Sequence, residues 1–262
     1  VFKGLPQARA LYTDAAVRAS RDIDILVDGA NFLEAANLML ANGFVRPSLP
    51  ISSTSLVSKA AIALVRDIGL VDSTTRIFVE LHRQLLSPDR GIESLVADAF
   101  RPRLASGGEI PAPPVSAELA FYLLLHGATS LWFRLLWIAD LVPLFANLAP
   151  AESQRLIALA EESKTHATIR AGLLLLQAAF PNSCPAELVE WSTRSIGHAS
   201  VARLRLYARS LNDGRQLGKP LGQRGVALRS TWLLSEDPIY RLLTLTKLPT
   251  THVLKALSRY TG

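Results

Sequence analysis

The sequence predicts an α+β protein, in which a small mixed sheet with helices is followed by an all-helical domain. Three observations predict this fold class. Two short segments, 22–28 and 76–82, alternate apolar and polar residues, as half-buried strands do. The stretch 101–115 is rich in proline and glycine, which is typical of an exposed connection. From Ser116 onward the apolar residues recur with helical periodicity.

The first domain, expected over residues 1–110, begins with a helix and a strand. Residues 5–17 repeat apolar groups at helical spacing, and residues 22–28 then change to a period of two. Side chains two apart on a strand share a face. One face is therefore apolar and the other is largely acidic, with Ile23, Ile25 and Val27 opposite Asp22, Asp24, Leu26 and Asp28.

A second helix and a second strand follow in this domain. Asn31 and Glu34 have the spacing of a capping pair at a helix start, and Gly43 suits the end of that helix. The stretch 44–75 mixes turn residues with an apolar run and is ambiguous between helix and strand. Residues 76–82 alternate again, and their two faces carry Ile77, Val79 and Leu81 on one side and Arg76, Phe78, Glu80 and His82 on the other.

The second domain, expected over residues 111–262, is predicted to be helical throughout. Its periodic segments are 117–128, 130–147, 151–163, 165–180, 185–195, 199–211, 237–246 and 250–259. The most apolar stretch, 119–146, carries His126, Arg134 and Asp140, and charges are costly in the middle of a bilayer. We therefore expect packed helices and no membrane span. Because buried charges need partners, we expect Arg134 and Asp140 to form an ion pair or to contact the first domain.

Charge and cysteine content indicate which binding partners and which cellular compartment suit the protein. The formal net charge is +6, and it is concentrated in residues 201–262, which hold eleven Lys and Arg residues and three acids. Such a segment suits an anionic partner, nucleic acid included, although a solvated helical surface has the same composition. Cys184 is the single cysteine, which excludes an intramolecular disulfide and a cysteine-based metal cluster. A reducing cytoplasm is the expected location.

The acidic face of the first strand is the centre of the functional argument. Asp22 and Asp24 are neighbours on that face, and two adjacent carboxylates repel unless a cation compensates them. Mg²⁺ takes oxygen ligands and is commonly shared between carboxylates and substrate phosphates. Glu80, on the polar face of the second strand, is the expected third carboxylate. Three such acids would hold two metal ions that activate an attacking oxygen and stabilise a leaving pyrophosphate.

A series of short motifs resembles the bacterial uncharacterised nucleotidyltransferase family, within the polymerase-beta-like superfamily. That family has K-G, R-x-x-x-D-I-D-L-L-V, G-[FY] and V-E-L-H-[WR] in this order, and later H…R-L-x-W-[IL]-x-D-L. The matching positions cover about residues 3–145, and their combined order and spacing is more specific than any single motif. They are Lys3-Gly4, Arg18 with Asp22 to Val27, Gly43-Phe44, Val79 to His82, His126, and Arg134 to Leu141.

This resemblance implies a nucleotidyltransferase fold that binds a nucleoside triphosphate with Mg²⁺ or Mn²⁺. Asp22, Asp24 and Glu80 would be the metal ligands and the catalytic carboxylates. Lys3-Gly4 stands where superfamily members usually carry a Gly-Ser pair, and a helix start of this kind attracts phosphate. Further phosphate contacts are expected from Arg18 and Arg21, which flank the acids, although they could simply balance Asp22 and Asp24. Supporting roles are expected for His82, His126, Arg134 and Asp140, with a structural hydrogen bond as the alternative for His82.

Three functions are consistent with the sequence. The first is an enzyme that moves a nucleoside monophosphate from a triphosphate to an unknown acceptor, a small molecule or a protein, and releases pyrophosphate. The second is a catalytically inactive member of the same fold that binds a nucleotide or a protein partner. The third is a modifier of nucleic acid that uses the basic segment 201–262 as its contact surface.

Overall fold

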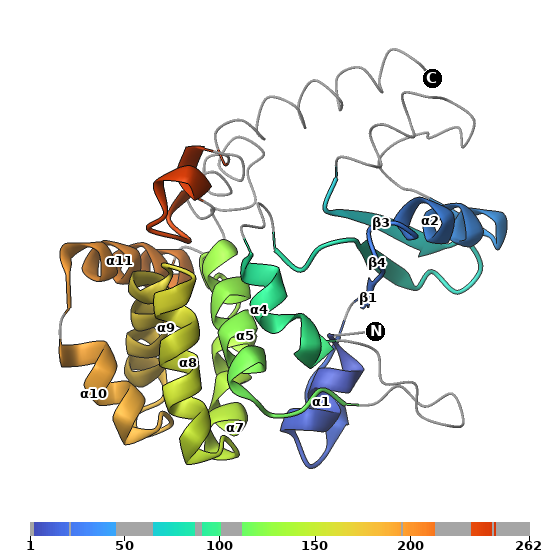
Figure 1. The fold of residues 1–262 in the computed structure, drawn as a ribbon. Coiled ribbons are helices and arrows are strands. Elements are labelled where there is room, and N and C mark those ends of the chain that lie inside the picture. The colour runs from blue at the N-terminus through green and yellow to red at the C-terminus, as the bar shows by residue number, and fades with distance from the viewer. Residues whose placement is uncertain are drawn as a thin grey trace. The chain divides into compact units, whose positions relative to one another are not determined.

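The protein is described by a computed structural model, which covers residues 3–20, 22–45, 65–86, 91–100, 112–194, 196–212, 232–242 and 244 of the 262. These residues fall into two compact units. One contains a sheet with the helices α1 and α2, and the other contains the helices α4 to α11 (Figure 1). The α+β class predicted from the sequence is confirmed: a small mixed sheet with helices, plus further helices.

The sheet of the first unit brings the two predicted strands together. Among the described residues its strands are β1 (Ile23–Leu26), β2 (Phe44–Val45), β3 (Asp67–Asp72) and β4 (Phe78–His82). Their order is β1-β4-β3-β2, with β1 parallel to β4 and the other pairs antiparallel. The central strand β3 lies in the stretch 44–75 that the sequence left ambiguous. Its Ile68 and Leu70 are buried at a spacing of two.

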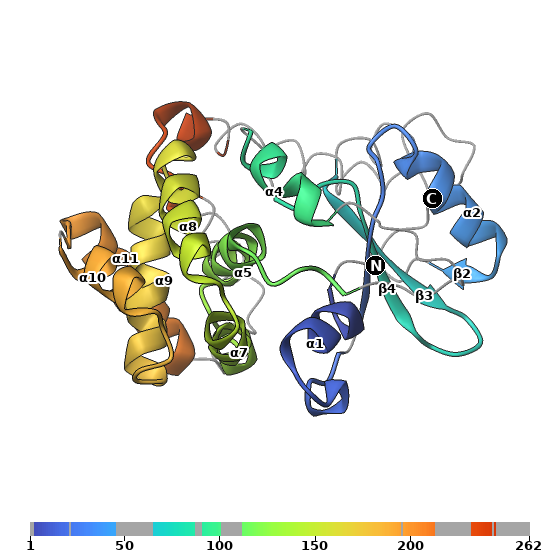
Figure 2. The ribbon, with the colours of Figure 1, turned by 60° about the horizontal axis from the view of Figure 1, so that its bottom comes forward.

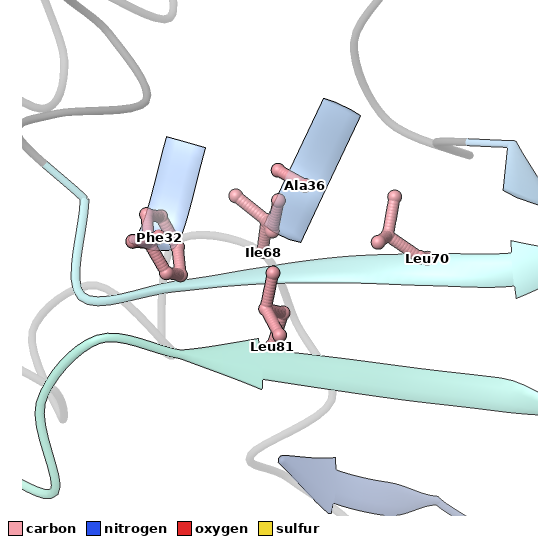
Figure 3. Close-up of a cluster of buried hydrophobic side chains, with 5 residues drawn as sticks. All are labelled: Phe32, Ala36, Ile68, Leu70 and Leu81. Atoms are coloured by element: carbon pink, nitrogen blue, oxygen red, sulfur yellow. The ribbon is translucent and has the colours of Figure 1, made fainter. Parts of the chain in front are cut away.

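One face of this sheet is covered by α2 (Phe32–Ala41). Phe32 and Ala36 of the helix are buried in one cluster with Ile68, Leu70 and Leu81 of the strands (Figure 3). Ile25 and Val27 pack against the same cluster, so the apolar face predicted for β1 does face the core. Since alternate residues of a strand point to opposite faces, Asp24 of β1 and Glu80 and His82 of β4 are left on the other face of the sheet.

The first helix is shorter than its periodicity predicted. A continuous helix over 5–17 was expected, but the structure has α1 (Leu5–Leu11) and then the single 3₁₀ turn η1 (Ala15–Val17). The helix ends because Tyr12 has an extended backbone, with φ of −120° and ψ of 142°. The side chain of Asp14 then accepts a hydrogen bond from Ala16 N, at 2.8 Å, and starts the separate turn.

The predicted capping pair of α2 is wrong, whereas its predicted end is confirmed. Asn31 already has a near-helical backbone, with φ of −96° and ψ of −1°, and its side chain makes no capping hydrogen bond. The side-chain hydrogen bond before this helix comes from Asp28 instead, whose carboxylate accepts a hydrogen bond from Ala30 N at 2.8 Å. At the other end Gly43 has φ of +89°, a left-handed conformation that glycine adopts without strain.

The second unit is helical in its described residues, and the domain bounds 1–110 and 111–262 stay a prediction. Its elements are α4 (Ile92–Phe100), α5 (Ala117–Thr129), α6 (Leu135–Ala139), α7 (Leu141–Ala146), α8 (Pro150–Glu162), α9 (His166–Ala179), α10 (Ala186–Arg194) and α11 (His198–Asn212). Helix α5 packs on α8 and α9, and α9 packs on α10 and α11 (Figure 2). Residues 238–242 are helical, and the segment 250–259 lies outside the described residues. No helix of the described residues has both the length and the apolar character needed to cross a bilayer.

The helix predicted over 130–147 starts late and is divided into α6 and α7, and its late start coincides with the placement of Trp132. Leu131 and Trp132 have positive φ values of 51° and 55°, and helix resumes at α6 and α7. The fully buried Trp132 ring lies against two glycines. A Cβ atom on Gly127 would lie 2.4 Å from the ring, and one on Gly172 would lie 3.4 Å from it. The absence of side chains at these two helix positions therefore makes room for the indole.

A buried ion pair attaches residues 232–242 to the helices of the second unit. Arg203 of α11 is 1% exposed, and its guanidinium lies 2.6 Å from a carboxylate oxygen of Glu236. The same group donates a hydrogen bond to Leu233 O at 2.7 Å. Arg203 is therefore not available for nucleic acid. Contact between nucleic acid and the rest of 201–262 stays a prediction, because 213–231 and 245–262 lie outside the described residues.

Candidate functional site

The pairing of β1 with β4 places the predicted acids side by side. Asp24 is the register partner of Glu80 in this parallel pair. Asp24 is almost completely buried, at 4% exposure, whereas Glu80 is partly exposed. The geometry expected of Asp24 and Glu80 is thus present: two carboxylates from adjacent strands on the face of the sheet opposite the α2 core.

His82 joins this pair from the same face of β4. Its Nε2 atom lies 2.8 Å from Asp24 Oδ1 and 3.3 Å from Glu80 Oε2, and its side chain is 3% exposed. Because an ionised carboxylate only accepts hydrogen bonds, the imidazole is the donor in the bond to Asp24. His82 therefore holds the two carboxylates next to each other, which is the structural hydrogen bond that was one of its two expected roles.

The three side chains have the composition of a cation site. One ligand atom from each of Asp24, Glu80 and His82 lies within 4.8 Å of the others. Carboxylate oxygens suit Mg²⁺ and Mn²⁺, and neutral imidazole is a common ligand of transition metals. The residues present therefore fit a divalent cation.

Lys3 is the positive charge that balances these acids in the structure. Its Nζ atom lies 3.0 Å from Asp24 Oδ1. Gly4, the residue before α1, has φ of +75°, and a Cβ atom there would lie 3.0 Å from the hydroxyl oxygen of Ser20. The close packing of Gly4 against Ser20 brings the start of the chain beside β1, and Lys3 thereby reaches the buried aspartate. Binding of phosphate by Lys3 and Gly4 stays a prediction.

Asp22 lies just before β1 and outside the group formed by Asp24, Glu80 and His82. Its main-chain oxygen accepts a hydrogen bond from the Ser20 hydroxyl at 2.8 Å, and its carboxylate lies 3.5 Å from the same hydroxyl. A metal-binding role for Asp22 remains a prediction. The same holds for phosphate binding by Arg18, which is half-buried after η1, and by Arg21, which lies outside the described residues.

Electrostatics at the site favour an ionised Asp24 and a protonated His82. Burial acts to raise the pKa of the Asp24 carboxyl, but the hydrogen bond from His82 and the charge of Lys3 outweigh it and lower the pKa from 3.8 to about 2. Burial likewise acts to lower the pKa of His82, but hydrogen bonds to Asp24 and Glu80 outweigh it and raise that pKa above its ordinary 6.5. Asp24 and His82 therefore stabilise each other's charged forms.

The lowered pKa of Asp24 predicts a loss of stability in acid. Since its folded pKa of about 2 lies below the ordinary 3.8, its contribution is complete above pH 3.8 and is lost as the pH falls through about 2. A shift of this size corresponds to about 2 kcal/mol of unfolding free energy. We expect the stability difference between wild type and Asp24→Asn, measured by urea unfolding at each pH, to shrink over this range. A difference that is constant with pH would contradict the proposed coupling.

The second set of predicted residues lies in the helical unit, and two of them, His126 and Arg134, contact the ring of Trp137. The His126 ring is 5.2 Å from the Trp137 ring, and the guanidinium of Arg134 is 5.5 Å from it. Arg134 also lies over Phe133, at 5.3 Å. Asp140, the residue between α6 and α7, is buried. Arg134 thus contacts aromatic rings, and its predicted ion pair with Asp140, or contact with the first domain, stays a prediction.

Sequence reasoning missed two features of the site. The first is the ion pair between Lys3 and Asp24, for which the chain carries no local signal because 21 positions separate the two residues. The second is Asp67, the register partner of His82 on β3, whose Oδ2 lies 3.9 Å from His82 Nδ1. The alternation of Ile68 and Leu70 beside it was the available signal for that strand.

Comparison with known proteins agrees with the motifs. The family model for uncharacterised nucleotidyltransferases matches residues 1–181, more than half of the chain. No curated protein and no solved structure gives a significant match. The matched range contains both strands of the acidic site and the residues His126, Arg134 and Asp140. The chain therefore belongs to the uncharacterised nucleotidyltransferase family.

Proposed function

We propose that the protein is a metal-dependent nucleotidyltransferase that moves a nucleoside monophosphate from a nucleoside triphosphate to an acceptor. The observation that supports it is the pairing of Asp24 with Glu80 across adjacent parallel strands, on the face opposite the core. Family membership supplies the reaction class, and the side-chain cluster supplies a place for the divalent cation that this reaction uses.

Each residue of the site has a distinct task in this proposal. Asp24 and Glu80 hold Mg²⁺ or Mn²⁺, and Asp22 joins them from the residue before β1. The bound cation would activate the attacking oxygen and stabilise the leaving pyrophosphate. Lys3 forms an ion pair with Asp24 in the structure. When the cation binds Asp24, the Lys3 ammonium group can bind a phosphate oxygen of the nucleotide instead. Burial of Asp24 excludes water from its side of the site, which strengthens each of these charge interactions.

The test is a thermal-shift measurement with each nucleoside triphosphate in the presence of Mg²⁺ or Mn²⁺. A ligand at about one hundred times its dissociation constant stabilises the native state by about 2.7 kcal/mol, which raises Tm by about 5–10 °C in a chain of this size. We expect this shift in wild type and not in Glu80→Gln. Glu34→Gln is the matched control, because Glu34 is an exposed acid of α2 in the same unit.

Two results would contradict the proposal. One is the absence of a shift with every triphosphate and both cations. The other is a shift of equal size in Glu80→Gln, because nucleotide binding would then not use the proposed carboxylate. A shift that persists when a chelator removes the cation would show nucleotide binding that does not depend on metal.

One observation favours a second function, an inactive nucleotide-binding member of the family. Lys3 and His82 already neutralise Asp24 within the chain, with contacts of 3.0 and 2.8 Å, so the buried carboxylate does not require a cation for its stability. The two functions differ in turnover. Release of pyrophosphate from a bound triphosphate, measured with a coupled assay, supports the enzyme, whereas stoichiometric binding without release supports the binding protein.

A further inference from the structure

We propose that His82 is itself a metal ligand, so that the site takes a first-row transition-metal ion in preference to Mg²⁺. The inference rests on the proposed function in one respect, that a cation binds at the Asp24 and Glu80 carboxylates. His82 would add a nitrogen ligand to the carboxylate oxygens of Asp24 and Glu80. A nitrogen ligand changes which metal ions the site prefers.

The spacing of the three ligand atoms supports coordination of one ion. Adjacent ligands around an octahedral cation, with bonds of about 2.1 Å, are about 3 Å apart. His82 Nε2 lies 2.8 Å from Asp24 Oδ1 and 3.3 Å from Glu80 Oε2. The imidazole nitrogen therefore already stands at ligand spacing from both carboxylates. A cation that enters between them would replace the proton now shared by Nε2 and the acids.

The strands hold His82 in this position. Glu80 and His82 are two apart on β4 and share a face, and the residue pairs Asp24–Glu80 and Leu26–His82 fix β4 against β1. On the other side of β4 the antiparallel pairing with β3 places Asp67 opposite His82. With 3% exposure, the imidazole has little freedom to turn away from the carboxylates.

The second nitrogen of the His82 ring lies near a carboxylate, as in many a metal-bound histidine, although the distance of 3.9 Å is longer than a hydrogen bond. Such a histidine usually directs its other nitrogen to a carboxylate or carbonyl, which fixes the ring and makes it a better ligand. Here Nδ1 lies 3.9 Å from Asp67 Oδ2, while Nε2 faces Asp24 and Glu80. Arg66 Nε holds the same Asp67 oxygen at 2.5 Å. Asp67 is therefore anchored on the far side of the ring from the proposed cation.

The nitrogen ligand decides the metal preference. Mg²⁺ favours oxygen ligands and retains its waters, whereas imidazole suits transition-metal ions. Mn²⁺ has the lowest affinity of the first-row series for a given nitrogen and oxygen site. A preference for Mn²⁺ over Mg²⁺ is therefore the most stringent form of the prediction, and Mn²⁺ also offers a paramagnetic signal.

The experiment measures Mn²⁺ binding to the full chain by electron paramagnetic resonance and Mg²⁺ binding by competition. We expect wild type to bind Mn²⁺ at least about tenfold more tightly than Mg²⁺ and His82→Gln to lose that preference. Glutamine keeps an amide donor near the carboxylates but has no imidazole nitrogen. The control is His198→Gln, which changes an exposed histidine at the start of α11. Spin-echo modulation from directly bound ¹⁴N should appear in wild type and vanish in His82→Gln.

The outcomes separate this inference from the proposed function. An unchanged Mn²⁺ to Mg²⁺ ratio in His82→Gln, or no ¹⁴N modulation in wild type, overturns the role of His82 and leaves a carboxylate site intact. Failure of wild type to bind either cation, with or without a triphosphate, overturns both. Should His82→Gln not fold, Asp67→Asn gives an independent reading, because it should weaken Mn²⁺ binding about tenfold without changing a ligand. An unchanged Mn²⁺ affinity in that variant contradicts the inference.

Discussion

Replacement of Asp24 by asparagine is expected to abolish the metal-dependent binding of nucleoside triphosphate and, with it, any release of pyrophosphate. A neutral amide attracts a divalent cation far less than a carboxylate does. Loss of an outer-shell partner already costs about 10- to 100-fold in metal affinity, and loss of a direct ligand should cost more. The thermal shift with triphosphate and cation measures the effect.

Asparagine is the informative substitution because two donors, on Lys3 and His82, contact the Asp24 carboxylate. The contacts of Asp24 with Lys3 and His82 are buried, and removal of one member of a buried ion pair costs about 3–5 kcal/mol. Alanine would leave both partners without an acceptor, whereas the carbonyl oxygen of asparagine can still accept a hydrogen bond. Asp24→Ala is therefore expected to be strongly destabilised, and a loss of binding in that variant would not be specific.

Asp28→Asn is the matched control for this prediction. Asp28 follows β1, is exposed, and accepts a hydrogen bond from Ala30 N, a role that an asparagine oxygen can keep. Its substitution should leave the triphosphate-dependent shift unchanged. Equal shifts in wild type and Asp24→Asn would show that the nucleotide binds elsewhere.

The largest loss of stability is expected from Trp132→Ala in the helical unit. The indole is fully buried between α5 and α9, and truncation of a buried tryptophan costs about 3–5 kcal/mol. Gly127→Ala tests the same contact from the helix side. Alanine is the better helix former by about 1 kcal/mol, but its Cβ atom would lie 2.4 Å from the ring, so the variant should be destabilised nonetheless.

Phe133→Ala is the control that distinguishes the loss of buried packing at Trp132 from the loss of any aromatic side chain. Phe133 is adjacent in sequence but 40% exposed, so its truncation should cost less than about 1 kcal/mol. Urea unfolding followed by far-ultraviolet circular dichroism measures all three variants. A loss in Phe133→Ala as large as that in Trp132→Ala would contradict the packing explanation.

Sequence by itself determined the fold class and the family, and it predicted the acids of the candidate site. Period-two alternation showed that Asp24 and Glu80 each lie on the polar face of a strand whose other face is apolar, and the core formed with α2 confirms those faces. These features are local, since the side-chain direction of a strand follows from its own backbone. The helices of the second unit were predicted for the same reason, because helical periodicity is also a property of neighbouring residues.

Tertiary structure alone decided which of these residues meet. The parallel register of β1 with β4 sets Asp24 opposite Glu80, and the antiparallel register of β3 sets Asp67 opposite His82. Lys3 reaches Asp24 through the packing of Gly4 on Ser20. Trp132, packed on two glycines, lies in the non-helical residues at the start of a helix that periodicity had predicted over 130–147. Each of these outcomes depends on contacts between segments far apart in the chain. Local sequence periodicity does not predict the energies of such contacts.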